Sequence, residues 1–492
     1  MSATTRAAPN PFALSESART RLAERLAEAR VRARRTLRER AEGDLGGQPS
    51  ALASLTVPVD PDLDLSAAVL AARRAEHDRF FCFEQPDRDG FVVAGVGQAA
   101  KLEARGPDRF SEVAATAREL GRRALADDLS GAPAASGPVF VGGFAFAHDG
   151  GASPEWSPLA PAALVLPEVS LARHRGEARM TVTVAVDGDE ALEALLERVD
   201  RRLAGLAAAP MPLIDPDPVE RARVVSAAHP SHYEQAVERA VERIRSGALE
   251  KIVLAREVRV HAARDHDPGA VLGALREVFP ACFCWCVGTP ELAFVGASPE
   301  LLVRRDGARA QTVALAGTTR RSADPAVDDH LGEQLARSPK EREEQAIVAR
   351  RIERALEPVS VWVTAAERPV LVKVHNLQHL GTPIRAQLAD PVPAVELAGR
   401  LMPTPAVGGE PREAAMPLIP ALEGLDRGWY AGAVGWTDLA EDGEFCVALR
   451  CALLRGPLAH LYAGCGIVRD SVPSDELAET EVKLQALLPL LA

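Results

Sequence analysis

Hydrophobic and polar residues alternate along residues 248–258, ALEKIVLAREV, which is the pattern of a β-strand. With a period of two residues, Lys251 and Val253 share one face of this strand, whereas Ile252 and Leu254 share the other. A sheet that buries such a strand must either hold the lysine ammonium at its rim or use it in chemistry. The pattern therefore marks Lys251 as a candidate functional residue.

Longer stretches show the spacing of amphipathic helices, namely residues 15–42, 231–247, 338–356 and 474–490. Gly247 is predicted to cap the second of these helices. The first helix is rich in arginine but carries charges of both signs, which favours a solvated helix over a nucleic-acid arm. Strand-like pieces lie between the helices without the regular spacing of βαβ units, so the predicted fold class is α+β.

Composition divides the chain into three segments. An Arg-rich helical extension is expected over residues 1–50, a first half over 51–215 and a second half over 216–492. The four prolines of residues 207–220 predict a connection between the two halves.

Charge and hydropathy exclude several classes of protein. Lys and Arg total 57 and Asp and Glu total 69, a net charge of -12 that argues against broad nucleic-acid binding. No run of about 18 apolar residues predicts a membrane span. The first residues also lack the pattern of a signal peptide, so a cytoplasmic protein is expected.

The seven cysteines are an odd number and lie mostly among apolar residues. This favours reduced thiols over a disulfide framework. Cys282, Cys284 and Cys286 would share one strand face, but no histidine lies near them in the sequence, so buried small residues are expected rather than a metal site.

Two predicted helices carry glutamates on their inward stripes. Glu344 lies on the apolar stripe of residues 338–356, and Glu476 and Glu479 share a face of the last helix with Lys483. Carboxylates that face a core need a cation, and Mg²⁺ favours carboxylate ligands. The spacing alone favours a surface pair between Glu479 and Lys483 over a metal site.

Other polar groups lie among small neighbours. In GEFCVALRCALL, strand alternation would place Arg450 among cysteine and alanine side chains, which leaves room for a carboxylate ligand. In LYAGCGIV, Gly464 and Gly466 would let backbone N–H groups approach an anion. Glu300 follows a Ser-Pro turn between two strand-like runs. Each of these features is usually structural when it occurs alone.

Several motifs follow one another in unbroken order from about residue 250 to 485: EKIVLAR, VGASPELLV, LAGTTRR, SPKEREEQ, HNLQHLGTP, LMPTPAVGG, YAGAVGW, VALRCALL, YAGCGIV and ELAETEVKL. In this order they resemble the chorismate-utilising enzymes, which include isochorismate, salicylate, anthranilate and aminodeoxychorismate synthases. The first half, with FFCFEQPDRDGFVVAGVG and PVFVGGFAF, is similar to the more variable half of this family.

The resemblance implies one large fold of two packed antiparallel sheets flanked by helices, with Mg²⁺ and chorismate in a shared site. By motif position it implies that Glu344 and Glu479 are direct Mg²⁺ ligands, with Glu476 beside them and Glu341 behind them. The positions that bind the substrate's carboxylates are matched by Tyr430, Arg450, Gly464, Gly466 and Lys483. Thr318 and His379 match positions near the ring and the metal.

The resemblance also implies roles for Lys251 and Glu300. Family members that add water at C2 of chorismate carry a lysine where Lys251 stands. A buried lysine beside other cations can serve as a base near neutral pH, and Lys251 would activate the water. Glu300 would protonate the departing C4 hydroxyl, which requires an apolar setting that keeps the carboxyl protonated. The expected activity is that of an isochorismate synthase.

Two positions bear on the choice among relatives. Ala406 lies where salicylate synthases typically carry threonine and isochorismate synthases alanine, so we expect little pyruvate loss. Gln345 stands where many members carry a histidine, directly after the metal-binding glutamate. Because the glutamate itself is retained, we expect this change to alter the Mg²⁺ affinity of the site without removing the site.

The alternatives are a salicylate synthase, a catalytically inactive relative and a subunit of an amidotransferase. The resemblance implies that the substrate is chorismate and that the protein is a monomer. Lys251 argues against a glutaminase subunit, and neither nucleic acid nor a membrane is expected as a partner. The product would feed either menaquinone or siderophore synthesis. Deletion of residues 1–45 is expected to leave the chemistry intact.

Overall fold

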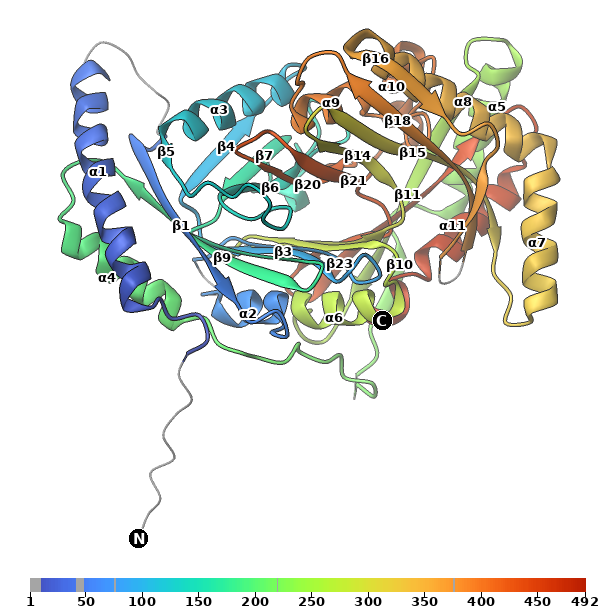
Figure 1. The fold of residues 1–492 in the computed structure, drawn as a ribbon. Helices are drawn as coiled ribbons and strands as arrows, with labels where there is room; N and C mark the ends of the chain where they lie inside the picture. Colours follow the sequence, from blue (N-terminus) through green and yellow to red (C-terminus); the bar gives the residue numbers. More distant parts are fainter. Residues whose placement is uncertain (1–9, 41–47, 75–76, 219, 375–376) are drawn as a thin grey trace.

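Two β-sheets lie one above the other at the centre of the protein (Figure 1). The computed structural model describes residues 10–40, 48–74, 77–218, 220–374 and 377–492, so parts of the predicted 1–50 extension lie outside the described residues. Over the described residues the sheets have 13 and 10 strands. All their strand pairs are antiparallel except the parallel pair of β1 and β5. This confirms the predicted fold class.

The first sheet runs in the order β10 (Arg223–Ser226), β11 (Lys251–His261), β23 (Leu458–Ile467), β22 (Cys451–Arg455), β13 (Ala293–Ser298), β12 (Phe283–Gly288), β2 (Phe80–Gln85), β3 (Phe91–Val96), β8 (Val169–His174), β9 (Glu177–Val186), β1 (Ala51–Val59) and β5 (Ala124–Leu125), with β19 (Gly409–Glu410) also paired to β11. The second sheet runs in the order β16 (Ser360–Ala365), β18 (Leu377–Leu388), β15 (Arg309–Arg320), β14 (Leu301–Asp306), β21 (Gly443–Val447), β20 (Ala433–Asp438), β6 (Val139–Phe144), β7 (Ala162–Leu166) and β4 (Ala100–Ala104), with β17 (Val370–Lys373) also paired to β18.

Both sheets run through the two halves of the chain. Strand β12 of the second half pairs with β2 of the first, with Cys284 opposite Glu84. In the other sheet, β20 pairs with β6, with Gly435 opposite Gly142. Because these ladders are continuous, each half completes sheets that the other half begins.

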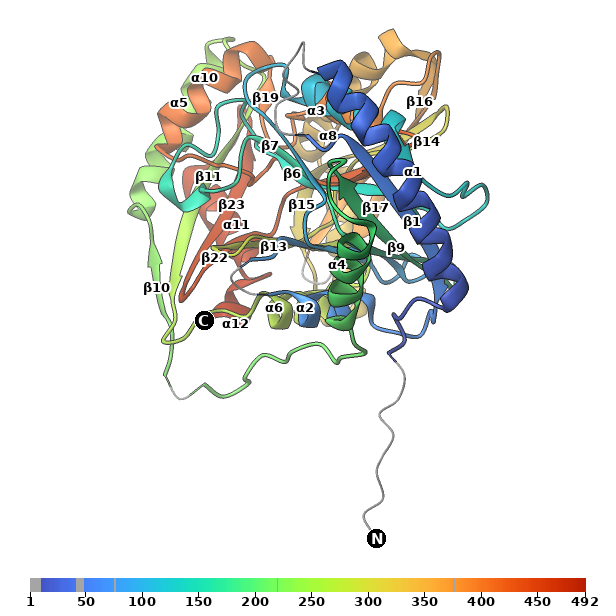
Figure 2. The same ribbon diagram turned by 90° about the vertical axis from the view of Figure 1, so that its left-hand side faces the viewer.

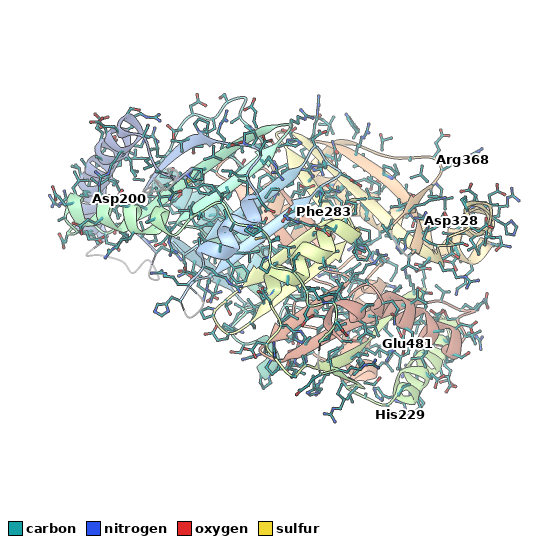
Figure 3. All side chains as sticks on the ribbon, turned by 90° about the horizontal axis from the view of Figure 1, so that it is seen from below. Asp200, His229, Phe283, Asp328, Arg368 and Glu481 are labelled. Atoms are coloured by element: carbon teal, nitrogen blue, oxygen red, sulfur yellow. The ribbon has the colours of Figure 1, made fainter. Side chains whose placement is uncertain are left out.

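Helices cover the outer faces of the sheets (Figures 1 and 2). In chain order they are α1 (Glu16–Arg40), α2 (Leu65–Ala72), α3 (Arg109–Arg123), α4 (Leu192–Ala204), α5 (Pro230–Arg245), α6 (Pro268–Val278), α7 (Pro325–Arg337), α8 (Pro339–Leu356), α9 (Ala394–Leu401), α10 (Arg412–Glu423), α11 (Pro473–Leu484) and α12 (Leu488–Leu491), with short 3₁₀ helices at Pro154–Trp156 and Glu357–Val359. Figure 3 shows Asp200 of α4 at one end of the molecule and Asp328 of α7 at the other.

The N-terminal helix α1 is less solvated than its charges predict. Phe12 before the helix, and Leu22 and Leu26 within it, are completely buried, and α1 packs against β1. Arg19 and Arg25 pair with Asp200 and Asp127. The charged face therefore meets solvent and neighbouring carboxylates, while the apolar stripe covers the sheet.

Helix α8 forms where the sequence predicts it. The Ser338 hydroxyl accepts a hydrogen bond from the Glu341 amide, and Pro339 occupies the first turn, which are both common helix starts. Ile347 and Val348 are buried on its inner stripe. The predicted last helix was too long: α11 ends at Leu484, and its apolar periodicity continues into α12 after a break.

All seven cysteines are buried and unbridged, as expected. Among the described helices, none is both long and apolar enough to cross a lipid bilayer.

Candidate active site

One pocket gathers almost all the residues predicted for the site. It lies among β11, β15, β18, β23, α8 and α11, and its empty space is about 930 Å³ including its open mouth. The predicted residues that line it are Glu300, Thr318, Glu344, His379, Ala406, Tyr430, Arg450, Gly464, Gly466, Glu476, Glu479 and Lys483, together with Glu341. Lys251 lies directly behind the wall.

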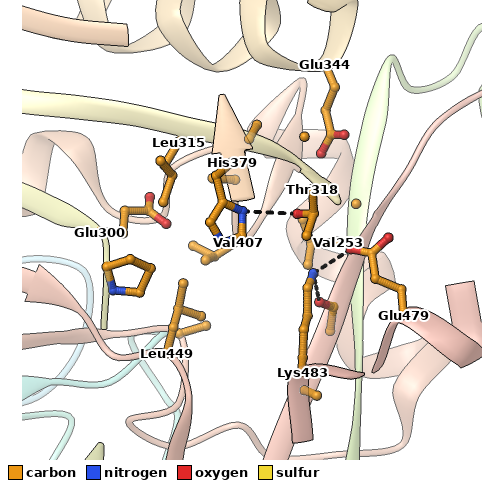
Figure 4. Close-up of a pocket in the computed structure, with 18 of the residues that line it drawn as sticks. Val253, Glu300, Leu315, Thr318, Glu344, His379, Val407, Leu449, Glu479 and Lys483 are labelled. Carbon is orange, nitrogen blue, oxygen red and sulfur yellow. Dashed lines mark hydrogen bonds and ion pairs between the residues drawn. The ribbon is translucent and has the colours of Figure 1, made fainter. Parts of the chain in front are cut away.

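Glu300 stands on an apolar side of the pocket. It follows β13 and directly precedes β14, and only 3% of its surface is exposed. Leu315, Val407 and Leu449 lie around it (Figure 4). Burial raises the pKa of Glu300 to about 8, and the charge of Lys251 opposes this rise only in part. At neutral pH the carboxyl is therefore mostly protonated, and it can donate a proton.

Lys251 begins β11 and is completely buried. Its Nζ lies 2.7 Å from Glu344 Oε1 on α8. The immediate neighbour of Lys251 is thus a carboxylate, which corrects the expectation of cationic surroundings. The contact joins the predicted base to a predicted metal ligand.

The glycines of β23 make this contact possible. A Cβ on Gly466 would clash with the Glu344 carboxylate and the Lys251 side chain. Gly464 leaves room for the Tyr430 hydroxyl, which would lie 3.1 Å from a Cβ at this position. The structure therefore gives these glycines a steric reason in addition to the anion contact that the sequence predicts.

Each predicted metal carboxylate lies beside a lysine ammonium: Glu344 beside Lys251 at 2.7 Å, Glu476 beside Lys340 at 3.5 Å and Glu479 beside Lys483 at 2.8 Å. The pair of Glu479 and Lys483, for which the sequence also allowed a surface position, lies in the pocket wall (Figure 4). Lys340 was not predicted, although it stands one turn before Glu344 on the same helix.

Four glutamates of the pocket wall share three lysine partners. The glutamates are Glu341, Glu344, Glu476 and Glu479, and the lysines are Lys251, Lys340 and Lys483. Burial and the neighbouring Glu344 raise the pKa of Glu341 to about 7. Burial also raises the pKa of Glu476, whereas the pKa of Glu479 is lowered: its burial is outweighed by the effect of Lys483. A cluster of hard oxygen donors with this excess of negative charge fits a divalent cation such as Mg²⁺.

Glu476 and Glu479 each place an oxygen within 4.8 Å of the other and of Cys465 Sγ. Burial raises the pKa of the Cys465 thiol, so it stays protonated and is a poor partner for Mg²⁺. Glu344 is not part of this group, and its carboxylate contacts Lys251.

Arg450 supplies the cationic side of the pocket, but it does not lie on a strand. The stretch GEFCVALRCALL forms two strands, β21 and β22, and Arg450 lies in the connection with φ +48°. The predicted alternation with Cys446 and Ala452 was therefore wrong, since the chain turns between these residues. The turn still directs the guanidinium into the pocket.

Arg450 and His379 form a buried pair. Arg450 Nη2 lies 2.6 Å from His379 Nε2, and His379 Nδ1 lies 3.1 Å from Thr318 Oγ1. Burial, with the charges of Arg450 and Lys483, lowers the pKa of His379 well below its usual value. Because a guanidinium only donates, Nε2 is the acceptor, and we assign the histidine proton to Nδ1. Among the described residues, buried Arg450 Nη1 has no hydrogen-bond partner and is available to an anion.

Ala406 lines the pocket, as predicted, in the loop between α9 and β19. Gln345 does not line it. Its Nε2 donates to Ala314 O at 2.8 Å and to Thr382 Oγ1 at 2.9 Å, and so ties α8 to two strands of the second sheet. Gln345 therefore helps to fix the helix that carries Glu344.

The sequence motifs did not show which apolar residues line the pocket, nor that a second tyrosine does. Leu315, Val407, Leu449 and Tyr462 line the pocket, and the Tyr462 ring stacks on Tyr430 at 5.2 Å. Each lies in or beside a quoted motif, but an apolar residue in a strand gives no signal that separates a pocket wall from the core.

Residues 39–492 match the family described as chorismate binding enzyme. The chain belongs to this family, which confirms the resemblance drawn from the sequence motifs.

Individual relatives show which kind of enzyme within this family the chain is similar to. The salicylate biosynthesis isochorismate synthase of Pseudomonas aeruginosa is 36% identical over 416 residues, covering 82% of this chain and 83% of that protein. The isochorismate synthase MenF of Bacillus subtilis is 32% identical over 428 residues, covering 85% and 89%. The solved structure of MenF, the menaquinone-specific isochorismate synthase from Escherichia coli, matches with a TM-score of 0.75 at 26% identity, covering 94% and 99%. By these similarities the chain is an enzyme of the isochorismate synthase type.

Proposed function

We propose that the chain converts chorismate into isochorismate. Water adds at C2, the ring double bonds shift, and the C4 hydroxyl leaves as water, so the reaction is redox-neutral. The observation that carries this proposal is Glu300, a buried carboxyl that keeps its proton near neutral pH on the wall of the pocket.

The proton balance assigns one group to each side of the reaction. Lys251, which pairs with Glu344 as an ammonium, would first release a proton and then take one from the attacking water as the oxygen bonds to C2. Glu300 gives its proton to the C4 hydroxyl as that bond breaks. Glu300 lies on one side of the pocket and Glu344, the neighbour of Lys251, on the other, which supports this division (Figure 4).

The substrate is a dicarboxylate, and the pocket offers cationic donors for it. Arg450 Nη1 is buried and unpaired among the described residues, and Lys483 Nζ contacts Gly464 O at 2.9 Å beside the pocket. Guanidinium and ammonium groups in a dry pocket bind carboxylates strongly. Tyr430, Thr318 and His379 would orient the substrate from their places on the wall.

The residues present fit a magnesium ion. Glu344, Glu476 and Glu479 would hold it, with Glu341 close by. When bound, Mg²⁺ would supply positive charge to a substrate carboxylate and balance the glutamates. Lys251, Lys340 and Lys483 are the cationic partners of these carboxylates in the structure.

A product assay tests the proposal. Purified protein, chorismate and Mg²⁺ are incubated without ammonia, and the products are separated by chromatography. Isochorismate without pyruvate is expected. Salicylate with pyruvate would show that Ala406 does not prevent lyase chemistry, and unchanged chorismate from folded protein would overturn the proposal.

We further propose that the enzyme works as a monomer without a glutaminase subunit. The lysine at position 251 supports the use of water rather than ammonia. Light scattering on the purified protein would give the mass, and added ammonia should not yield an aminated product.

A further inference from the structure

One edge of β11 is only partly paired with strands. Along the fully paired edge, β23 pairs with it from Ile252 to His261. Along the opposite edge, β19 pairs with Lys251 and Ile252, and β10 pairs with residues 258–261. Among the described strands, none pairs with the stretch between them on that edge. This stretch includes Val253, which lines the pocket.

Two side chains take the place of the missing strand. Alternate residues of a strand direct their N–H and C=O groups to the same edge, so Val253 and Ala255 face this gap. The Ala255 amide donates to Glu423 Oε1 at 2.6 Å. Arg427 Nη2 donates to the Val253 carbonyl oxygen at 2.9 Å. The Ala255 amide and the Val253 carbonyl are thus satisfied by a carboxylate and a guanidinium, whereas the Val253 amide donates to the Gly408 carbonyl oxygen at 2.7 Å.

Glu423 and Arg427 also bind each other. Their Oε2 and Nε lie 3.0 Å apart, and their Oε1 and Nη2 lie 2.5 Å apart, so the pair is bidentate. Both side chains are almost fully buried, with 1% and 2% exposed. The guanidinium also lies over the Phe146 ring at 4.3 Å. This geometry gives the pair one fixed arrangement.

Arg427 reaches two further parts of the pocket wall. Its Nη1 donates to the Val407 carbonyl oxygen at 2.8 Å, beside Ala406. Its guanidinium carbon is 5.8 Å from the centre of the Tyr430 ring. Val407 and Tyr430 line the pocket, whereas Arg427 and Glu423 do not.

We propose that Arg427 and Glu423 are positioning residues for the proposed reaction. They hold the strand that begins with Lys251, the loop of Ala406 and Val407, and the Tyr430 ring in one fixed arrangement. They do not touch the substrate, and act through these three wall elements. The inference rests on the proposed function for its kinetic consequence, but the contacts themselves can be tested without substrate.

The test uses Arg427→Lys, which keeps the charge and loses the fork of donors. Arg202→Lys is the matched control, because Arg202 also binds a buried carboxylate, that of Asp78, through two hydrogen bonds in the first half of the chain, with 10% of the Arg202 side chain exposed. For each variant, kcat, KM, the thermal midpoint and deuterium uptake of residues 251–257 are measured. A double variant, Arg427→Met with Glu423→Gln, removes both charges and serves if Arg427→Lys does not fold.

We expect Arg427→Lys to lose at least tenfold in kcat/KM and to exchange faster at residues 251–257. Arg202→Lys should change neither by more than about twofold at a comparable thermal midpoint. Unchanged kcat/KM with unchanged exchange in Arg427→Lys would overturn the proposal, as would equal losses in both variants. If the wild-type protein leaves chorismate unchanged, the proposed function fails, while the exchange measurement still decides whether Arg427 fixes this strand.

Discussion

The carboxyl group of Glu300 combines deep burial with a place on the pocket wall. If it is the general acid, its protonated form is required, and this form is lost as the pH rises through about 8. Wild-type kcat/KM should therefore fall above about pH 8. Glu300→Gln should lower kcat by about 10²–10⁴-fold, the usual contribution of a general acid. A pH–rate profile of both proteins checks this, and a substantially active Glu300→Gln enzyme would contradict the role.

The same carboxyl links stability to pH. The pKa of Glu300 is about 8 in the folded protein against an ordinary value of 4.5, so the folded state binds the proton more tightly. The resulting stabilisation is complete below about pH 4.5 and is lost as the pH rises through about 8. One pKa unit corresponds to about 1.4 kcal/mol, so the loss amounts to a few kcal/mol at most.

Glu300→Gln should remove this dependence. The free energy of unfolding of the variant minus that of the wild type should be larger at pH 9 than at pH 5. Urea unfolding at the two pH values measures the difference, and the same difference at both would show that the carboxyl ionises normally.

Individual residues show which features of the site the sequence motifs predict and which they do not. The motifs predicted that Glu300, His379 and Tyr430 belong to one site, and the three residues line one pocket. The prediction was possible because members of one family share a fold, so that matching motif positions lie in matching places. The motifs did not reveal that Lys251 contacts Glu344, since that contact depends on the packing of a helix against a strand distant in sequence. Strand alternation failed at Arg450 because a left-handed residue turns the chain there.

Helices α8 and α11 approach the pocket from different parts of the chain and carry the candidate metal ligands. A bound Mg²⁺ would link them, and a ligand that binds only the folded state stabilises it by about 2.7 kcal/mol at 100 times its Kd. Mg²⁺ alone should therefore raise the thermal midpoint without chorismate. Glu476→Gln should abolish most of the rise.

Glu481→Gln is the matched control for this experiment. Glu481 lies on the same helix, but its side chain is 56% exposed and pairs with Arg256 outside the pocket. This variant should keep the response to Mg²⁺. An equal response in the Glu476→Gln protein would exclude Glu476 as a ligand.

The N-terminal helix α1 was expected to be dispensable for the chemistry, but it covers part of the first sheet. Phe12, Leu22 and Leu26 are fully buried, and each such side chain stabilises the fold by about 1.5–3 kcal/mol. Deletion of residues 1–45 should lower the thermal midpoint strongly or cause aggregation. Arg21→Ala, on the exposed face, should leave it unchanged. A truncated protein with wild-type stability would show that the helix is only an attachment.

Helix prediction succeeded where end signals were present. Ser338 and Pro339 gave α8 a defined start, and its inner stripe was visible in the sequence. The last helix was overextended because Leu487 and Leu490 continue the apolar period, although the chain leaves the helix after Leu484. Periodicity reports which face is buried and does not show where backbone hydrogen bonding stops.

At the scale of the whole molecule, the sequence indicated the fold class through its family motifs but not the strand order. The pairs of β12 with β2 and of β20 with β6 join segments far apart in the chain, and no local pattern announces them. The proline-rich stretch suggested a connection between halves. The structure shows that the halves share both sheets on either side of it.

These shared sheets have a consequence for how the chain can be cut. Residues 206–222 form no helix or strand over their described part, so a protease could cleave there without breaking a ladder. The two fragments would still be held together by the strand pairs of both sheets. Co-expressed as separate polypeptides, they should assemble into one particle. Each should aggregate when made alone, because the strand edges at which the two parts pair, β12 with β2 and β20 with β6, would be exposed.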